Sequence, residues 1–165
     1  MSMTAETQSI VRILLVSGAV ASVMFCMPAS AKDPKAYCAR VGNDDRLQPV
    51  PDVLLPNARR MFDVPADMAA THAKATTWVR CMSGAVWLCN SGANLTCGKA
   101  DVGRKSPGAD EFCKQNPDSI GVPMSATGHA TVYDWKCVGR EARIIGQIME
   151  IDGRGFMAEN WKQLQ

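Results

Sequence analysis

The chain lacks most of the short motifs that indicate a particular reaction. It has no C-x-x-C-H segment, which excludes covalently attached c-type haem. It also has no C-x-x-C pair and only two histidines, His72 and His129, whereas zinc sites use closely spaced ligand pairs. Phosphate-binding loops, dinucleotide fingerprints and the G-x-S-x-G hydrolase motif are absent as well. The sequence therefore predicts no metal site and no cofactor.

Neither sign of charge is in marked excess, and long apolar runs are also scarce. The formal net charge is +2, and no run of Lys and Arg forms the basic patch that nucleic acids require. The longest apolar run, residues 13–27, falls short of the roughly 20 residues that a spanning helix needs. We predict no nucleic-acid partner, and no membrane span once the N-terminal segment is removed.

That N-terminal segment has the features of an export signal. Arg12 precedes the apolar run, and Ala29 and Ala31 form a small-x-small cleavage pattern before Lys32. We expect residues 1–31 to be a signal peptide and residues 32–165 to form a single domain that is periplasmic or secreted. A membrane anchor, or a lipoprotein modified at Cys26, is the alternative interpretation.

The cysteines support export. Cleavage would remove one of the seven and leave an even number, which in an exported chain indicates three disulfides. The six are Cys38, Cys81, Cys89, Cys97, Cys113 and Cys137.

Two β-hairpins are predicted. In residues 76–97, apolar and β-branched residues run up to Ser83 and Gly84 and away again, so that Cys81 faces Val86 across the turn. Residues 131–151 alternate around a type II′ turn at Gly139 and Arg140. That register places one apolar set on a single face: Tyr133, Trp135, Cys137, Ala142, Ile144 and Ile148.

Short helices should cover these strands. Asp33 followed by Pro34 indicates a helix start, as does Ser106 followed by Pro107. Residues 43–56 carry three prolines and are expected to be an extended connector. The predicted fold is α+β: a small disulfide-stapled domain with a β-hairpin and a C-terminal antiparallel β-meander covered by short helices.

The hairpin register also suggests the disulfide pairing. Cys81 and Cys89 point to opposite faces, which excludes a bond between them. Cys81 and Cys137 each lie on an apolar hairpin face, so we hypothesise that they join the two hairpins across one core. The remaining hypothesised pairs are Cys97–Cys113 and Cys38–Cys89.

Three segments together resemble a set of small exported proteobacterial proteins of unknown function. They are residues 78–101, W-V-R-C-M-S-G-A-V-W-L-C-N-S-G-A-N-L-T-C-G-K-A-D; residues 127–129, T-G-H; and residues 133–137, Y-D-W-K-C. The resemblance covers most of residues 32–165 and implies a bacterial, periplasmic setting without an activity. A weaker similarity, to small periplasmic lysozyme inhibitors, rests on export, β-rich content and a cysteine before a hairpin glycine.

Two functions follow from these observations. The first is a non-catalytic binding or inhibitory module of the cell envelope with a protein or glycan partner. Its predicted binding residues are Trp78, Arg80, Trp87, Asn94 and Lys99, since aromatic and Arg side chains dominate binding energies. The alternative is a small periplasmic hydrolase using His129, which would need a nucleophile beside that histidine.

Overall fold

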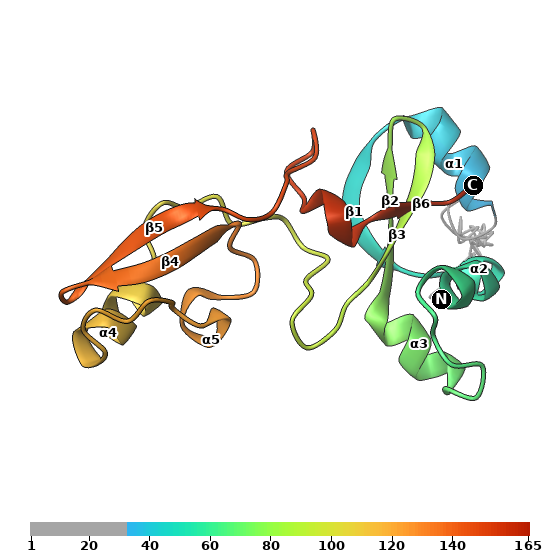
Figure 1. Cartoon of the computed structure of the whole chain (residues 1–165). Coiled ribbons are helices and arrows are strands. Elements are labelled where there is room, and N and C mark those ends of the chain that lie inside the picture. Colours follow the sequence, from blue (N-terminus) through green and yellow to red (C-terminus); the bar gives the residue numbers. More distant parts are fainter. Residues whose placement is uncertain (1–32) are drawn as a thin grey trace, which may run out of the picture.

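The computed structural model describes residues 33–165, so the predicted signal peptide lies outside the described part of the chain. The fold is α+β, as predicted, with antiparallel strands, short helices and three disulfides. Figure 1 shows a four-stranded sheet with its helices at one end of the molecule and a two-stranded hairpin with its helices at the other. Within residues 33–165, no helix has the length and apolar character needed to cross a membrane.

The larger sheet has the strand order β1-β2-β3-β6, with β1 Asp44–Pro49, β2 Thr77–Met82, β3 Ala85–Asn90 and β6 Lys162–Gln163. The predicted register of the central hairpin is confirmed, since Cys81 pairs with Val86 and Val79 pairs with Leu88. Ser83 and Gly84 both have positive φ, 52° and 78°, which is the type I′ turn that suits the twist of a hairpin. The edge strand β1 was not expected, because residues 43–56 looked like a connector, and no strand was predicted at residues 162–163.

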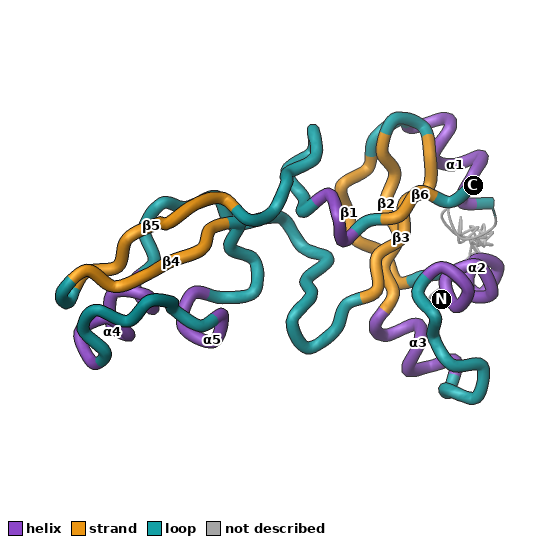
Figure 2. The backbone as a smooth tube through the Cα atoms, viewed as in Figure 1, coloured by secondary structure: helices purple, strands orange, loops and turns teal. Residues whose placement is uncertain are grey.

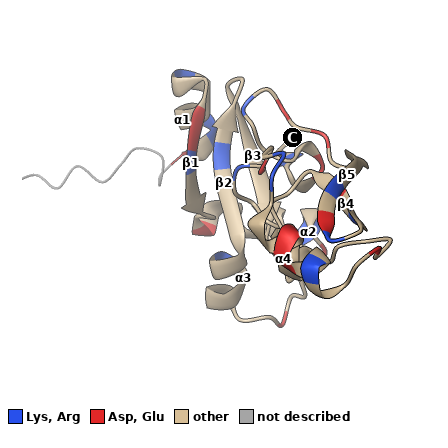
Figure 3. Cartoon of the chain, turned by 90° about the vertical axis from the view of Figure 1, so that its left-hand side faces the viewer, with Lys and Arg blue, Asp and Glu red and all other residues tan. Residues whose placement is uncertain are grey.

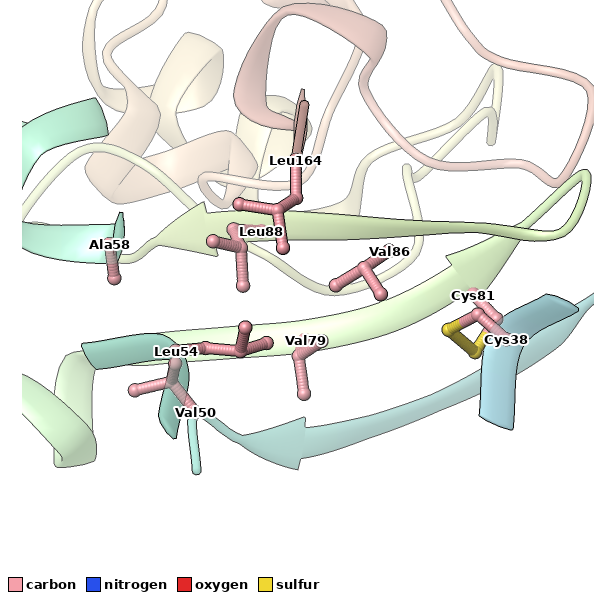
Figure 4. Packing of buried hydrophobic residues seen from close by; sticks show 9 residues of the cluster. All are labelled: Cys38, Val50, Leu54, Ala58, Val79, Cys81, Val86, Leu88 and Leu164. Atoms are coloured by element: carbon pink, nitrogen blue, oxygen red, sulfur yellow. A yellow bond between two sulfur atoms is a disulfide. The ribbon is translucent and has the colours of Figure 1, made fainter. Parts of the chain in front are cut away.

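Helices cover one face of this sheet (Figure 2). Helix α1, Pro34–Val41, begins at the predicted cap, where the Asp33 side chain accepts a hydrogen bond from the Ala36 amide at 3.0 Å. A 3₁₀ turn, Asp52–Leu54, leads into α2, Leu55–Met61, and α3, Ala70–Thr76, runs directly into β2. Figure 4 shows the resulting core, in which Val79, Val86 and Leu88 pack with residues from the helices and from the C-terminal Leu164.

The second hairpin consists of β4, Tyr133–Val138, and β5, Glu141–Gln147. Helix α4, Pro107–Gln115, packs against both strands, and α5, Met124–Thr127, packs against α4. The predicted pairs Trp135–Ile144 and Cys137–Ala142 are confirmed. A register shift between Asp134 and Trp135 was not anticipated. Ile148 lies beyond this shift and beyond the end of β5, and it is 50% exposed instead of belonging to the apolar face.

Two chain segments connect the ends of the molecule. One runs from the four-stranded sheet to the second hairpin after Cys97, and the other runs back after β5. The two segments are joined where the Ala100 amide donates to the Gly155 carbonyl at 2.9 Å. The return path ends in β6, which pairs with β3 through Trp87–Gln163 and Leu88–Lys162. The C-terminus is therefore part of the first sheet.

All three hypothesised disulfide pairs are wrong, although the exclusion of a Cys81–Cys89 bond is confirmed. The bonds are Cys38–Cys81, Cys89–Cys97 and Cys113–Cys137. The two hairpins do not share one core, because each has its own helices. Each hairpin cysteine therefore bonds to the segment that covers its own face: α1 for Cys81, the following loop for Cys89, and α4 for Cys137.

Candidate ligand pocket

The predicted binding residues Trp78, Arg80 and Trp87 lie on the sheet face opposite α1. There they surround a buried cluster formed by Cys89, Cys97, Phe156 and Trp161. Both Trp78 and Trp87 are half-buried, and the Trp87 indole nitrogen donates to the Met82 carbonyl at 3.2 Å. This face is thus a second core, covered by the returning C-terminal segment.

Arg80 lies inside this second core and is 2% exposed. Its guanidinium forms an ion pair with Asp152, and its Cζ atom lies 4.0 Å from the Phe156 ring centroid and 4.5 Å from that of Trp161. Burial lowers the pKa of Arg80, and Asp152 opposes that effect by stabilising the charged form. Arg80 therefore holds the C-terminal segment onto the sheet and offers no exposed guanidinium to a partner.

The other two predicted residues are exposed. Lys99 lies above the Phe156 ring, 4.2 Å from its centroid, and pairs with Asp45 at 2.7 Å. Asp45 also accepts from Arg154, and this hydrogen bond is the main reason that the pKa of Asp45 is lowered. Asn94 lies in the turn closed by the Gly92–Leu95 bridge.

His129 is half-buried after α5 and, within residues 33–165, its side chain makes no hydrogen bond or ion pair. The six cysteines of this part of the chain are all in disulfides, so none supplies a thiolate beside it. Nor do residues 33–165 contain a cluster of three or more His, Cys, Asp or Glu side chains that could hold a metal ion.

A pocket that the sequence did not reveal lies between α1, β1 and β2, with a volume of about 210 Å³. Its apolar wall contains three prolines, the Val79 side chain and the Cys38–Cys81 disulfide. The full lining is Pro34, Tyr37, Cys38, Asp44, Arg46, Gln48, Pro49, Pro51, Val79, Arg80 and Cys81. Figure 4 shows that the disulfide links α1 to β2 at one end of the helix-covered core.

One side of the pocket is polar and tightly hydrogen-bonded. The Tyr37 hydroxyl donates to Asp44 at 2.6 Å, and Arg46 donates to both Asp44 carboxylate oxygens through Nε at 2.9 Å and Nη2 at 2.8 Å. Nη2 also donates to the Tyr37 hydroxyl at 3.1 Å. The bonds from Arg46 hold the pKa of Asp44 well below its usual range, and those to Asp44 raise the pKa of Arg46.

Local structure explains how these three side chains meet. The bulge between Asp44 and Gln48 interrupts the pairing of β1 with β2, and Tyr37 reaches the bulge from α1. Both kinds of charge occur around α1, β1 and β2 in Figure 3. The sequence signals were Asp44, Asp45 and Arg46 followed by Pro49 and Pro51, but they suggested only an extended connector because the strand itself was not predicted.

Comparisons with known proteins give no further information about this site. No protein-family model, no curated protein and no solved structure matches the chain.

Proposed function

We propose that this protein is a non-catalytic binding module of the bacterial cell envelope, and that it receives one ring-sized apolar group of a protein partner in the pocket beside α1. The observation that supports this most directly is the pocket itself, with apolar walls and one organised polar side. Ligand sites in proteins have this composition: mostly apolar surface with a few well-placed polar groups.

The size of the pocket limits what it can take. An apolar cavity of about 150 Å³ holds a benzene molecule. A pocket of about 210 Å³ therefore has room for one aromatic ring or one branched aliphatic side chain, and little more. A single side chain of a larger partner matches that capacity better than a long chain or an oligosaccharide does.

The pocket is also held in shape before anything binds. The Cys38–Cys81 disulfide joins its helix to its strand, and prolines restrict the backbone at Pro49 and Pro51. Less conformational freedom is then lost on association, which favours binding. Three disulfides fit an exported protein in an oxidising compartment.

NMR titration with a neutral probe, N-acetylphenylalanine amide, tests this function. We expect saturable shifts of the Val79 methyl and Tyr37 ring signals, and no such shifts with N-acetylglycine amide, which has no ring. In Gln48→Trp the indole would occupy the pocket, so the shifts should disappear. The matched control is Gln147→Trp, on exposed β5, which should bind like the wild type.

Two results would contradict the proposed function. One is a wild-type protein that shows no saturable shifts with the ring-containing probe. The other is a folded Gln48→Trp variant that binds it as the wild type does. If Gln48→Trp does not fold, Val79→Phe fills the pocket from β2 instead and is judged by the Tyr37 ring signals alone.

A further inference from the structure

We propose that the group bound in this pocket carries a carboxylate next to its ring or branched apolar part, as the C-terminal residue of a polypeptide does. This inference rests on the proposed function and adds to it the charge of the ligand. It follows from which hydrogen-bonding groups of Tyr37, Asp44 and Arg46 are already used and which remain.

Asp44 has no acceptor capacity left for a ligand. Its two oxygens accept four hydrogen bonds, from the Tyr37 hydroxyl and from the backbone amide, Nε and Nη2 of Arg46. A carboxylate offers about four lone-pair positions, so these bonds occupy them all. An amine or other cation entering the pocket would find this carboxylate already neutralised and saturated.

Arg46, in contrast, still has donors to offer. A guanidinium has five N–H groups, and three of them are used by Nε and Nη2 toward Asp44 and Tyr37. The two N–H groups of Nη1 bond to nothing within residues 33–165. Because the bonds to Asp44 fix the plane of the guanidinium, these two donors are held in place before a ligand arrives.

The exposure of the Asp44 and Arg46 side chains also favours a negatively charged ligand. The Asp44 side chain is 10% exposed, whereas that of Arg46 is 77% exposed, so a ligand entering from solvent meets the cation and not the anion. A second cation, Arg40, lies over the Tyr37 ring with its Cζ atom 5.6 Å from the centroid. Guanidinium groups pair with carboxylates through charge-assisted hydrogen bonds, which are stronger than neutral ones.

The test compares two probes that differ only in this group, N-acetylphenylalanine and its amide. We expect the acid to bind roughly two- to fivefold more tightly in low salt, because one charge-assisted bond at an exposed site contributes about that much. The difference should shrink as salt is added, since Arg46 is exposed and screening weakens its attraction. Phenethylamine, a cation with the same ring, should bind more weakly than the amide.

Variants of the arginine separate this inference from a general effect of charge. Arg46→Gln removes the free donors and leaves Asp44 without its cation, so the ratio of acid affinity to amide affinity should fall to one or below. Arg143→Gln is the matched control, because Arg143 is also an exposed arginine paired with a neighbouring acid, Glu141. It should keep the wild-type preference.

The outcomes distinguish the two proposals. Equal binding of the acid and the amide to the wild type, or tighter binding of the amine, would overturn the carboxylate inference and leave the pocket function standing. No binding of any probe would overturn the pocket function itself. A peptide ending in phenylalanine then tests the source: tighter binding than N-acetylphenylalanine supports a polypeptide C-terminus, and equal binding would contradict it in favour of a small acid with the same carboxylate chemistry.

Discussion

At the scale of single residues, Arg80 shows how a charge can be placed inside a small protein. Its guanidinium has one anionic partner, Asp152, and lies against the rings of Phe156 and Trp161. The Arg80 Nε atom is buried without a hydrogen-bond partner, which adds a desolvation cost. Such a pair stabilises the fold only while both members are present, because a single buried charge is far more costly than a pair.

Asp152→Asn tests this dependence. The substitution keeps an oxygen that can accept from the amides of Arg154 and Phe156, so the turn is preserved and mainly the charge is lost. We expect the free energy of unfolding in urea, with disulfides intact, to fall by about 3–5 kcal/mol. The double variant Arg80→Met/Asp152→Asn should recover most of that loss.

The exposed ion pair between Arg143 and Glu141 supplies the control for that measurement. Glu141→Gln should change the free energy of unfolding by less than about 1 kcal/mol, as is usual for surface pairs. A nearly neutral Asp152→Asn would mean that the buried guanidinium does not depend on this carboxylate.

At the scale of elements, the type I′ turn between β2 and β3 sets the register of the central hairpin. A one-residue slip would exchange the two sheet faces, moving Val79 and Cys81 away from α1 and Arg80 toward it. Gly42 reinforces the turn, because its carbonyl accepts from the Gly84 amide at 2.7 Å. The turn thus determines which side chains face each of the two cores.

Gly84→Ala should weaken this turn. Gly84 has φ +78°, a conformation that costs a residue with a Cβ about 1–2 kcal/mol, although nothing lies closer than 3.9 Å to the added atom. We expect the free energy of unfolding in urea to fall by that amount. Gly92→Ala is the control, since Gly92 has no positive φ and open space around it, and an equal loss there would refute a conformational cause.

At the scale of the whole molecule, no disulfide within residues 33–165 joins its two ends. Cys38–Cys81 and Cys89–Cys97 belong to the four-stranded sheet, and Cys113–Cys137 belongs to the second hairpin. The two ends are connected by the paired crossing segments around Ala100 and Gly155, and by the return of the chain to β6. Each end can therefore lose its own disulfide with limited effect on the other.

Removing Cys113–Cys137 by a double substitution to alanine should loosen one end selectively. The bond spans 24 residues, and the chain-entropy model gives it about 3.5 kcal/mol. In amide hydrogen exchange we expect α4, β4 and β5 to lose protection while β2 and β3 keep theirs. A uniform loss along the chain would show instead that the two ends unfold as one unit.

The sequence by itself determined the features that depend on neighbours in the chain. Turn residues and alternation predicted both hairpins and most of their pairs, and Asp33 and Ser106 predicted the starts of α1 and α4. The pairing of all six cysteines was expected from their even number together with the predicted export signal. These features come from backbone preferences and side-chain period, which act over a few residues.

Only the tertiary structure decided which surfaces meet. It gave each hairpin its own helices, so the cysteine pairs are local to each face, and it buried Arg80 beneath a segment about 70 residues further along the chain. It also made a strand of residues 44–49 and so brought Asp44 and Arg46 to Tyr37. Packing between distant segments depends on the shape of whole faces, and the period of a single strand contains no information about which helix will cover it.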